Sequence, residues 1–153
     1  MKLLKFIIVA LLTLTTTQAM SQKAQVIGIS HSDFVEWVYP NMRGPVVILF
    51  GSNYCGYSRQ QLKILKQVLT NDDGSITNYI SFYSVNIDTW EDDAWLSRIY
   101  DDDEDEQGTP TWVFYYLDED GDPDYYYVTG NMDASYMRQM FRNLKYDSYY
   151  IND

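Results

Sequence analysis

The feature that most constrains the fold is a run of five apolar residues, Val46 to Phe50, with no polar residue between them. A strand with one face in water alternates apolar and polar side chains, whereas a strand covered on both faces is a continuous apolar run. We therefore predict that this run is a central strand of a sheet with helices on both sides, which is the layering of an α/β domain.

The rest of the chain predicts a single domain with the element order βαβαβαββα. The expected strands are residues 25–29, 46–50, 80–88, 112–117 and 125–128. Between and after them, helical patterns cover residues 34–38, 59–69, 90–100 and 133–144. Strands that alternate with helices pair in parallel, and the turn at residues 118–123 adds an antiparallel hairpin. We expect a central mixed β-sheet flanked by helices, in a domain of residues 22–145 followed by a polar tail, residues 146–153.

Residues 1–21 are predicted to be a signal peptide. Lys2 and Lys5 precede a short apolar core, Phe6 to Leu14, and small residues follow where a signal peptidase would cut. The apolar core is too short to span a bilayer as a permanent helix. The sequence therefore predicts an exported protein, periplasmic in a bacterium or secreted, with no permanent membrane anchor.

The charge of the chain limits its partners. The formal net charge is −11 at pH 7, and a surface of this sign repels nucleic acid and anionic lipid. A cationic or unfolded polypeptide partner is compatible with it, although the charge alone also keeps a protein soluble. Six consecutive acids, Asp101 to Glu106, are expected to form a solvated loop.

The only cysteine, Cys55, lies where the apolar strand ends and the next helix begins. Free backbone N–H groups at the start of a helix stabilise a thiolate and lower its pKa. Without a second cysteine no internal disulfide can form, which suggests a reactive thiol or a dimer linked through Cys55. The alternative is a buried, inert cysteine.

The motif from Phe50 to Ser58, with Cys55 in a C-x-x-S spacing, resembles the active site of the thioredoxin family. Three further segments resemble the same family: Val85–Asp88 at the end of a central strand, Gly108–Thr111 around a proline, and Gly130 after the last strand. The resemblance covers about Val26 to Leu144. It implies a thioredoxin-like fold.

The resemblance also implies roles for individual residues. Cys55 would be the attacking thiol, and Ser58 would hydrogen-bond its sulfur. Pro110 would be a cis-proline packed against Cys55, and Thr109 would offer its backbone to an extended substrate. The remaining substrate-binding candidates surround the cysteine in the sequence: Tyr54, Gly56 and Tyr57.

Several positions depart from the family pattern. Ser58 replaces the second cysteine, Tyr57 replaces a proline, and Tyr54 replaces a tryptophan. Leu49 stands where thioredoxins have a buried acid that transfers a proton. These departures argue against a conventional dithiol reductase.

Two functions remain. The first is thiol–disulfide exchange or isomerisation through mixed disulfides at Cys55, with protein thiols and disulfides or small-molecule thiols as partners. The second is a non-enzymatic, chaperone-like module that binds polypeptide with its aromatic surface.

Neither function requires a cofactor, and no metal site is expected. The segment Asp118 to Asp122 has the spacing of the start of a calcium loop, but Thr129 stands where the bidentate Glu should be, and a hairpin turn is favoured. His31, the only histidine, is expected at a helix start.

Overall fold

The computed structural model describes residues 24–100 and 108–150, with side chains described up to residue 145. The predicted signal peptide and the acidic run Asp101–Glu106 lie outside the described residues. No helix in the described ranges combines the length and the apolar character that a membrane span requires.

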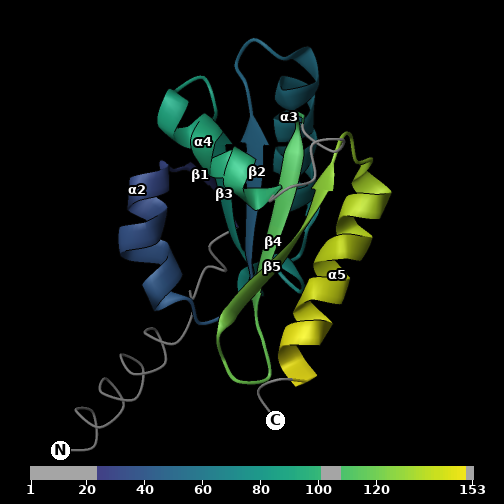
Figure 1. The fold of residues 1–153 in the computed structure, drawn as a ribbon. Coiled ribbons are helices and arrows are strands. Elements are labelled where there is room, and N and C mark those ends of the chain that lie inside the picture. Colours follow the sequence, from purple (N-terminus) through teal and green to yellow (C-terminus); the bar gives the residue numbers. More distant parts are fainter. Residues whose placement is uncertain (1–23, 101–107, 151–153) are drawn as a thin grey trace, which may run out of the picture.

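One mixed sheet of five strands forms the centre of the molecule, in the order β1-β3-β2-β4-β5 (Figure 1). The strands are β1 (Val26–Gly28), β2 (Val46–Gly51), β3 (Ser81–Asn86), β4 (Thr111–Leu117) and β5 (Pro123–Thr129). β1, β3 and β2 are parallel, whereas β4 is antiparallel to both β2 and β5. The predicted element order and the mixed sheet are confirmed.

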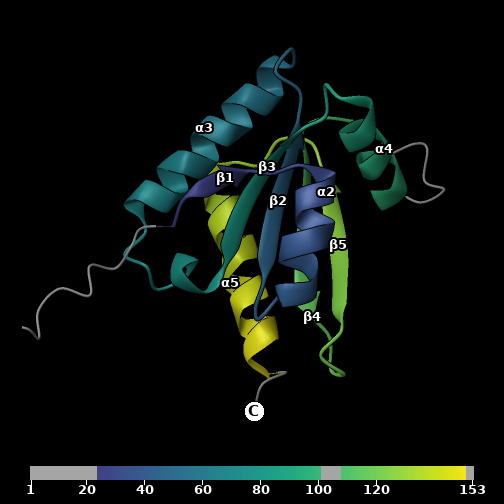
Figure 2. The same cartoon turned by 90° about the vertical axis from the view of Figure 1, so that its left-hand side faces the viewer.

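Helices cover both faces of the sheet, α2 and α4 on one and α3 and α5 on the other (Figure 2). Their bounds are α2 (His31–Asp33), which continues as a π-helical turn (Phe34–Val38) and a 3-10 turn (Tyr39–Asn41), α3 (Gly56–Asn71), a 3-10 turn (Thr77–Tyr79), α4 (Trp90–Ile99) and α5 (Ala134–Tyr150). Ser30 caps α2 by accepting the N–H of Asp33, so His31 is the first residue of this helix, as expected.

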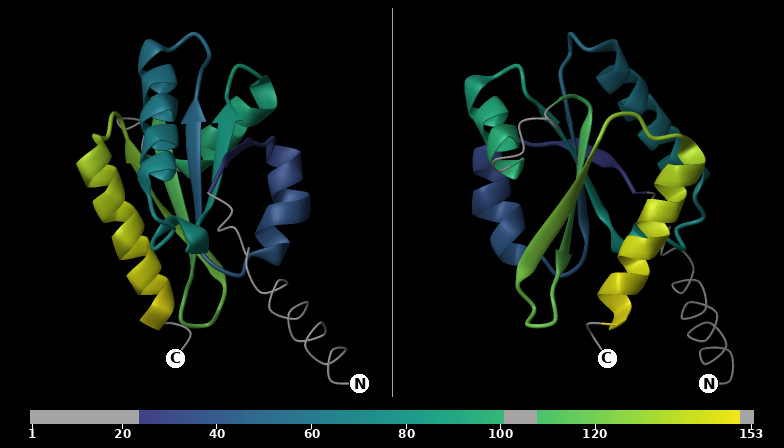
Figure 3. Two further views of the ribbon diagram at one scale, coloured as in Figure 1. Left: turned by 180° about the vertical axis from the view of Figure 1, so that it is seen from behind. Right: turned by 45° about the vertical axis from the view of Figure 1, so that its right-hand side comes forward.

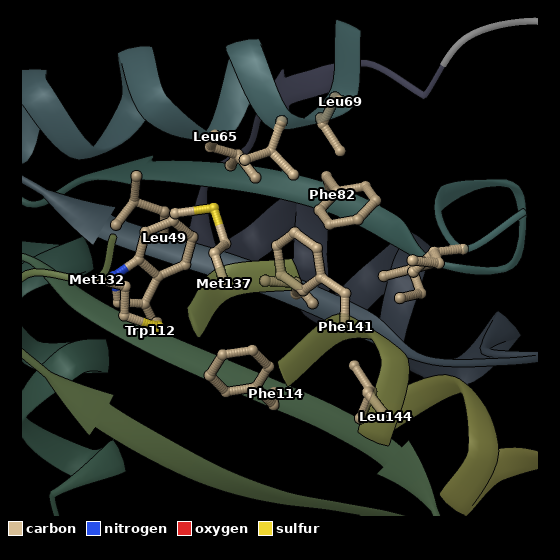
Figure 4. Packing of buried hydrophobic residues seen from close by; sticks show 14 residues of the cluster. Leu49, Leu65, Leu69, Phe82, Trp112, Phe114, Met132, Met137, Phe141 and Leu144 are labelled. Atoms are coloured by element: carbon tan, nitrogen blue, oxygen red, sulfur yellow. The ribbon is translucent and has the colours of Figure 1, made fainter. Parts of the chain in front are cut away.

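Side chains of the apolar run Val46–Phe50 alternate between two cores. Val47 and Leu49 point into a cluster with α3 and α5, whose members include Leu65, Phe141 and Leu144 (Figure 4). The other residues of the run pack toward α2 and α4 with Phe34, Trp95 and Leu96. Each large apolar side chain buried in this way contributes about 1.5–3 kcal/mol relative to exposure. The absence of alternation in the sequence therefore reflects burial on both faces.

The last helix is longer than predicted. We expected it to end at Leu144 with a polar tail from residue 146, but α5 continues to Tyr150. Asp133 caps its start by accepting the N–H groups of Ser135 and Tyr136. The residues after Leu144 include neither glycine nor proline before position 150, so no strong stop signal ends the helix earlier.

Asp118 to Asp122 form the turn of the β4–β5 hairpin. One carboxylate oxygen of Asp118 accepts the N–H groups of Asp120, at 3.0 Å, and Asp122, at 2.8 Å. Gly121 has φ +83°, a left-handed conformation that favours glycine. The hairpin alternative is therefore confirmed. Across the described part of the chain, no three His, Cys, Asp or Glu side chains are grouped so that they could hold a metal ion.

Candidate functional site

Cys55 occupies the N-cap position of α3. A short loop leads from the end of β2 into this helix (Figure 3). Its backbone is extended, with φ −87° and ψ 117°, and its N–H donates to the carbonyl of Ser52 at 3.1 Å. The side chain is half-buried. The thiol therefore lies at the helix end that carries free N–H groups and a partial positive charge.

Cys55 contacts the segment before β4, which is distant from it in the sequence. The Cys55 thiol donates to the carbonyl oxygen of Thr109 over 3.7 Å, and the Thr109–Pro110 peptide bond is cis. Pro110 is buried and Thr109 is half-buried. The structure thus brings together Cys55 and Thr109, two residues that the resemblance assigns to one site. Their roles toward a substrate stay predictions.

The pKa of the Cys55 thiol is lowered from its ordinary value. The largest cause is the Ser58 hydroxyl, followed by the Ser58 backbone N–H. Burial acts in the opposite direction, and smaller contributions from Thr109 and the Tyr57 N–H again lower the pKa. Ser58 Oγ is itself buried and has no hydrogen-bond partner of regular geometry among the described residues. Its hydroxyl is therefore available to the thiolate once the thiol proton has left.

We predict that Ser58→Ala raises the pKa of Cys55 toward the ordinary value of a thiol, because the variant removes the largest stabilising group. The measurement is the rate of iodoacetamide alkylation as a function of pH, whose midpoint should move upward. Ser97→Ala is the matched control, since this exposed hydroxyl on α4 bonds only locally, to the Asp93 carbonyl. An unchanged midpoint in Ser58→Ala would show that the Ser58 hydroxyl does not lower the thiol pKa.

The loop that carries Pro110 is held from two sides. The Tyr100 hydroxyl lies 2.7 Å from the Gly108 carbonyl oxygen, accepts the Gly108 N–H at 3.1 Å, and also contacts the Thr111 hydroxyl. On the other side the Pro110 carbonyl accepts the N–H of Gly130 at 2.8 Å. Gly130 has φ +102°, which a residue with a side chain rarely adopts. These contacts fix the position of the Thr109 backbone beside the thiol.

A carboxylate joins the Cys55 loop to the next loop of the sheet. Asp88, after β3, accepts the Ser52 hydroxyl at 2.6 Å and the Asn53 N–H at 3.2 Å. The Ser52 hydrogen bond is the main reason that the pKa of Asp88 is lowered, and the Asn53 N–H adds to it. The β2–α3 and β3–α4 loops therefore form one connected edge.

Three aromatic side chains along this edge are exposed to solvent. Tyr54 is 89 % exposed and Trp90 is 84 % exposed, and Tyr57 is also exposed. Gly56, the first residue of α3, is exposed, and a Cβ there would meet only the Arg59 guanidinium, at 3.9 Å. The predicted substrate-binding residues Tyr54, Gly56 and Tyr57 are thus accessible next to the thiol.

Leu49 is buried, as its place in the apolar run predicted, and belongs to the core cluster of α3 and α5. This chain therefore has an apolar side chain at the position where the family has a buried acid. The contribution of Tyr100, Ser52 and Trp90 to the site was not predicted. A local signal existed only for Trp90, a large apolar residue that is followed by three acids at the start of the expected helix over residues 90–100.

Comparisons with known proteins agree with this geometry. A family model described as a thioredoxin-like domain matches residues 38–145. Among solved structures, chloroplastic thioredoxin z has a TM-score of 0.60 at 18 % identity, with 80 % of this chain and 96 % of that chain covered. The Malassezia sympodialis thioredoxin Mala s 13 has a TM-score of 0.58 at 21 % identity, with 80 % and 92 % covered. A mutant thioredoxin from Halobacterium salinarum has a TM-score of 0.57 at 16 % identity, with 84 % and 96 % covered.

At these identities the solved structures establish the fold alone, whereas the family model extends over most of the chain. A search of curated protein sequences found no match. The mixed five-stranded sheet, the cysteine at the start of α3 and the Thr109–Pro110 loop beside it all fit the matched family. The chain therefore belongs to the thioredoxin-like family, which indicates a function of the thiol–disulfide type.

Proposed function

We propose that the protein is an exported thiol–disulfide exchange protein that works through mixed disulfides at Cys55 and has no resolving thiol of its own. The observation that carries this proposal is the thiol at the N-terminus of α3 with a lowered pKa, next to the buried hydroxyl of Ser58. A lowered pKa increases the thiolate fraction near neutral pH, and the thiolate is the species that attacks a disulfide.

The reaction balances without a cofactor. The Cys55 thiolate attacks one sulfur of a substrate disulfide, a new disulfide forms between Cys55 and that sulfur, and the other substrate sulfur leaves as a thiolate. The mixed disulfide persists until another thiolate attacks the substrate sulfur and returns Cys55 to its thiolate form. When that thiolate belongs to the substrate the net result is isomerisation, and when it is a small-molecule thiol the substrate is released with that sulfur in a disulfide to the small molecule.

Export is the second part of the proposal. Disulfides persist in the periplasm and outside the cell, so substrates for such a thiol are available there. The predicted signal peptide, residues 1–21, supports this location. Sequencing the N-terminus of the mature protein tests it, since a start between Met20 and Gln22 is expected and a retained Met1 on exported protein would contradict it.

We predict that the native protein, incubated with a peptide disulfide, accumulates an adduct on Cys55 and does not reduce the peptide catalytically. Intact mass spectrometry under non-reducing conditions measures the adduct. It also distinguishes a free thiol, a small-molecule adduct and a Cys55-linked dimer. Cys55→Ser is the control and should remain unmodified.

A second candidate, polypeptide binding without chemistry, is favoured by the exposed Tyr54, Tyr57 and Trp90. The same experiment separates the two. If the native protein forms no adduct but the unfolded protein does, Cys55 is inert in the fold, and binding through the aromatic edge becomes the better account of the site.

A further inference from the structure

A pocket of about 290 Å³ lies on the side of α3 away from the Thr109 loop. Its walls are the carboxyl ends of the parallel strands β1, β2 and β3, residues that directly follow β1 and β2, and residues near the starts of α3 and α4. β2 leads to a helix on one face of the sheet, and its neighbour β3 leads to a helix on the other face (Figure 2). This arrangement at the carboxyl ends of parallel strands is where open α/β sheets bind ligands.

Ser58 lines this pocket, and the state of its hydroxyl indicates that the pocket binds a ligand. The side chain is 5 % exposed, and its Oγ has no hydrogen-bond partner of regular geometry among the described residues, although the hydroxyl is close enough to Cys55 to lower the thiol pKa. Buried hydroxyls in native proteins are nearly always paired, so an unpaired one requires an explanation. When the Ser58 hydrogen is directed at the Cys55 thiolate, the lone pairs of Oγ still lack a donor.

The other polar groups of the pocket favour a donor with positive charge. Asp92, 8 % exposed, accepts the His31 N–H at 2.9 Å and the Thr89 hydroxyl at 2.8 Å, one on each carboxylate oxygen. Each of these oxygens has a further lone pair. The one basic side chain among the pocket's described walls, Arg59, already donates to the Asn53 carbonyl.

An ammonium group presents three donors and no acceptor, which complements a carboxylate and a hydroxyl oxygen. Among the remaining walls, Ser30, Ser52 and Asn86 already form hydrogen bonds within the protein, and the Ser84 hydroxyl suits a ligand hydroxyl. The volume is near the lower limit of small-molecule sites, about 300 Å³. The ligand must therefore be small.

We propose that this pocket binds a small amino alcohol, with its ammonium group between Asp92 and the Ser58 hydroxyl. Binding would couple to the thiol, because a donor to Ser58 Oγ polarises the Ser58 O–H toward Cys55. This coupling rests on the proposed function of Cys55, whereas binding itself does not.

The test uses 2-amino-1,3-propanediol and glycerol, which differ only in an ammonium or a hydroxyl on the central carbon. In an NMR titration of the protein, the amino alcohol should shift the amide signals of Ser58, Asn86 and Asp92. It should bind at least about tenfold more tightly than glycerol, because charge-assisted hydrogen bonds are roughly twice as strong as neutral ones. Equal affinities, or no shifts at tens of millimolar, would overturn the proposal.

Asp92→Asn and Ser84→Val locate the site, and Glu91→Gln is the control. Asp92→Asn should weaken binding of the amino alcohol about tenfold, in line with the loss of a charged hydrogen bond. Glu91→Gln, the same charge change at an exposed neighbour outside the pocket walls, should leave it unchanged. Should Asp92→Asn fail to fold, Ser84→Val tests the site by filling the pocket and should abolish binding. Full affinity in a folded Asp92→Asn or Ser84→Val protein would overturn the assignment.

A separate readout tests the contact with Ser58. Below the pKa of the thiol, saturating amino alcohol should speed iodoacetamide alkylation of Cys55 about fivefold, the low end of typical coupling between sites. Binding seen by NMR with no change in this rate would refute the contact with Ser58. An unreactive Cys55 with intact binding would instead refute the proposed exchange function, so the two failures are distinguishable.

Discussion

Replacing Ser58 with cysteine is expected to change a protein that retains a mixed disulfide into one that releases it. Position 58 lies in the first turn of α3, three residues after Cys55, and its hydroxyl is already close enough to lower the thiol pKa. A thiol there can attack the Cys55 sulfur of the adduct, form an internal disulfide and expel the substrate as a thiolate.

The site has room for the larger sulfur atom. Ser58 packs against Gly51, where a Cβ would lie only 2.8 Å from the Ser58 Cβ, and its other side borders the pocket next to β3. Release of the adduct should be at least about a hundredfold faster than in the native protein, because a well-placed intramolecular thiol acts at a very high effective concentration. Intact mass as a function of time measures the release.

Ser58→Ala is the matched control, since it alters the same position without adding a thiol. It should keep the adduct as long as the native protein does. Release from the native protein as fast as from Ser58→Cys, without added thiol, would show that a resolving thiol is unnecessary. A Ser58→Cys protein that forms the adduct but no internal disulfide would show that the two positions are out of reach of each other.

Much of the fold was predictable because it depends on local patterns. The unbroken run Val46–Phe50 indicated burial on both faces, and the alternation of its side chains between two cores explains why no polar residue was tolerated. Turn residues such as Gly121 marked the hairpin. The predicted end of α5 is wrong because polar, Tyr-rich residues are typical of a tail, whereas nothing in residues 145–150 stops a helix.

The residues of the candidate site can be divided in the same way, into those that a local pattern predicts and those that it does not. Cys55 and Ser58 were predictable because their spacing in the chain fixes their spacing in a helix. The proximity of Thr109 followed from the resemblance to a family, not from any pattern in the residues. The Asp88–Ser52 bond, the Tyr100 contacts and the pocket beside Ser58 join segments that meet only when the sheet is assembled. No periodicity or spacing in the sequence specifies such contacts.

Restoring the family's buried acid with Leu49→Asp is expected to make the stability of the protein fall steeply with rising pH. Leu49 is 2 % exposed, in the core cluster next to Trp112 on the paired strand (Figure 4). A carboxyl group here should have its pKa raised by about 2–3 units, somewhat less than for complete burial, because the pocket reaches this residue. The buried indole N–H of Trp112, which has no partner among the described residues, is a donor that the carboxylate could recruit.

The sign follows from proton binding. Above about pH 4, the ordinary pKa of aspartate, the unfolded chain loses its proton while the folded protein still holds it, so unfolding is favoured increasingly as the pH rises to the folded pKa. With a folded pKa near 6.5, the free energy of unfolding should be about 2 kcal/mol lower at pH 8 than at pH 5. Urea unfolding at the two pH values measures the difference, and Leu49→Asn serves as the uncharged control of the same shape. An Asp variant whose pH dependence matches that of the Asn variant would show that water or Trp112 solvates the carboxylate fully, and that the fold could carry the acid at no cost.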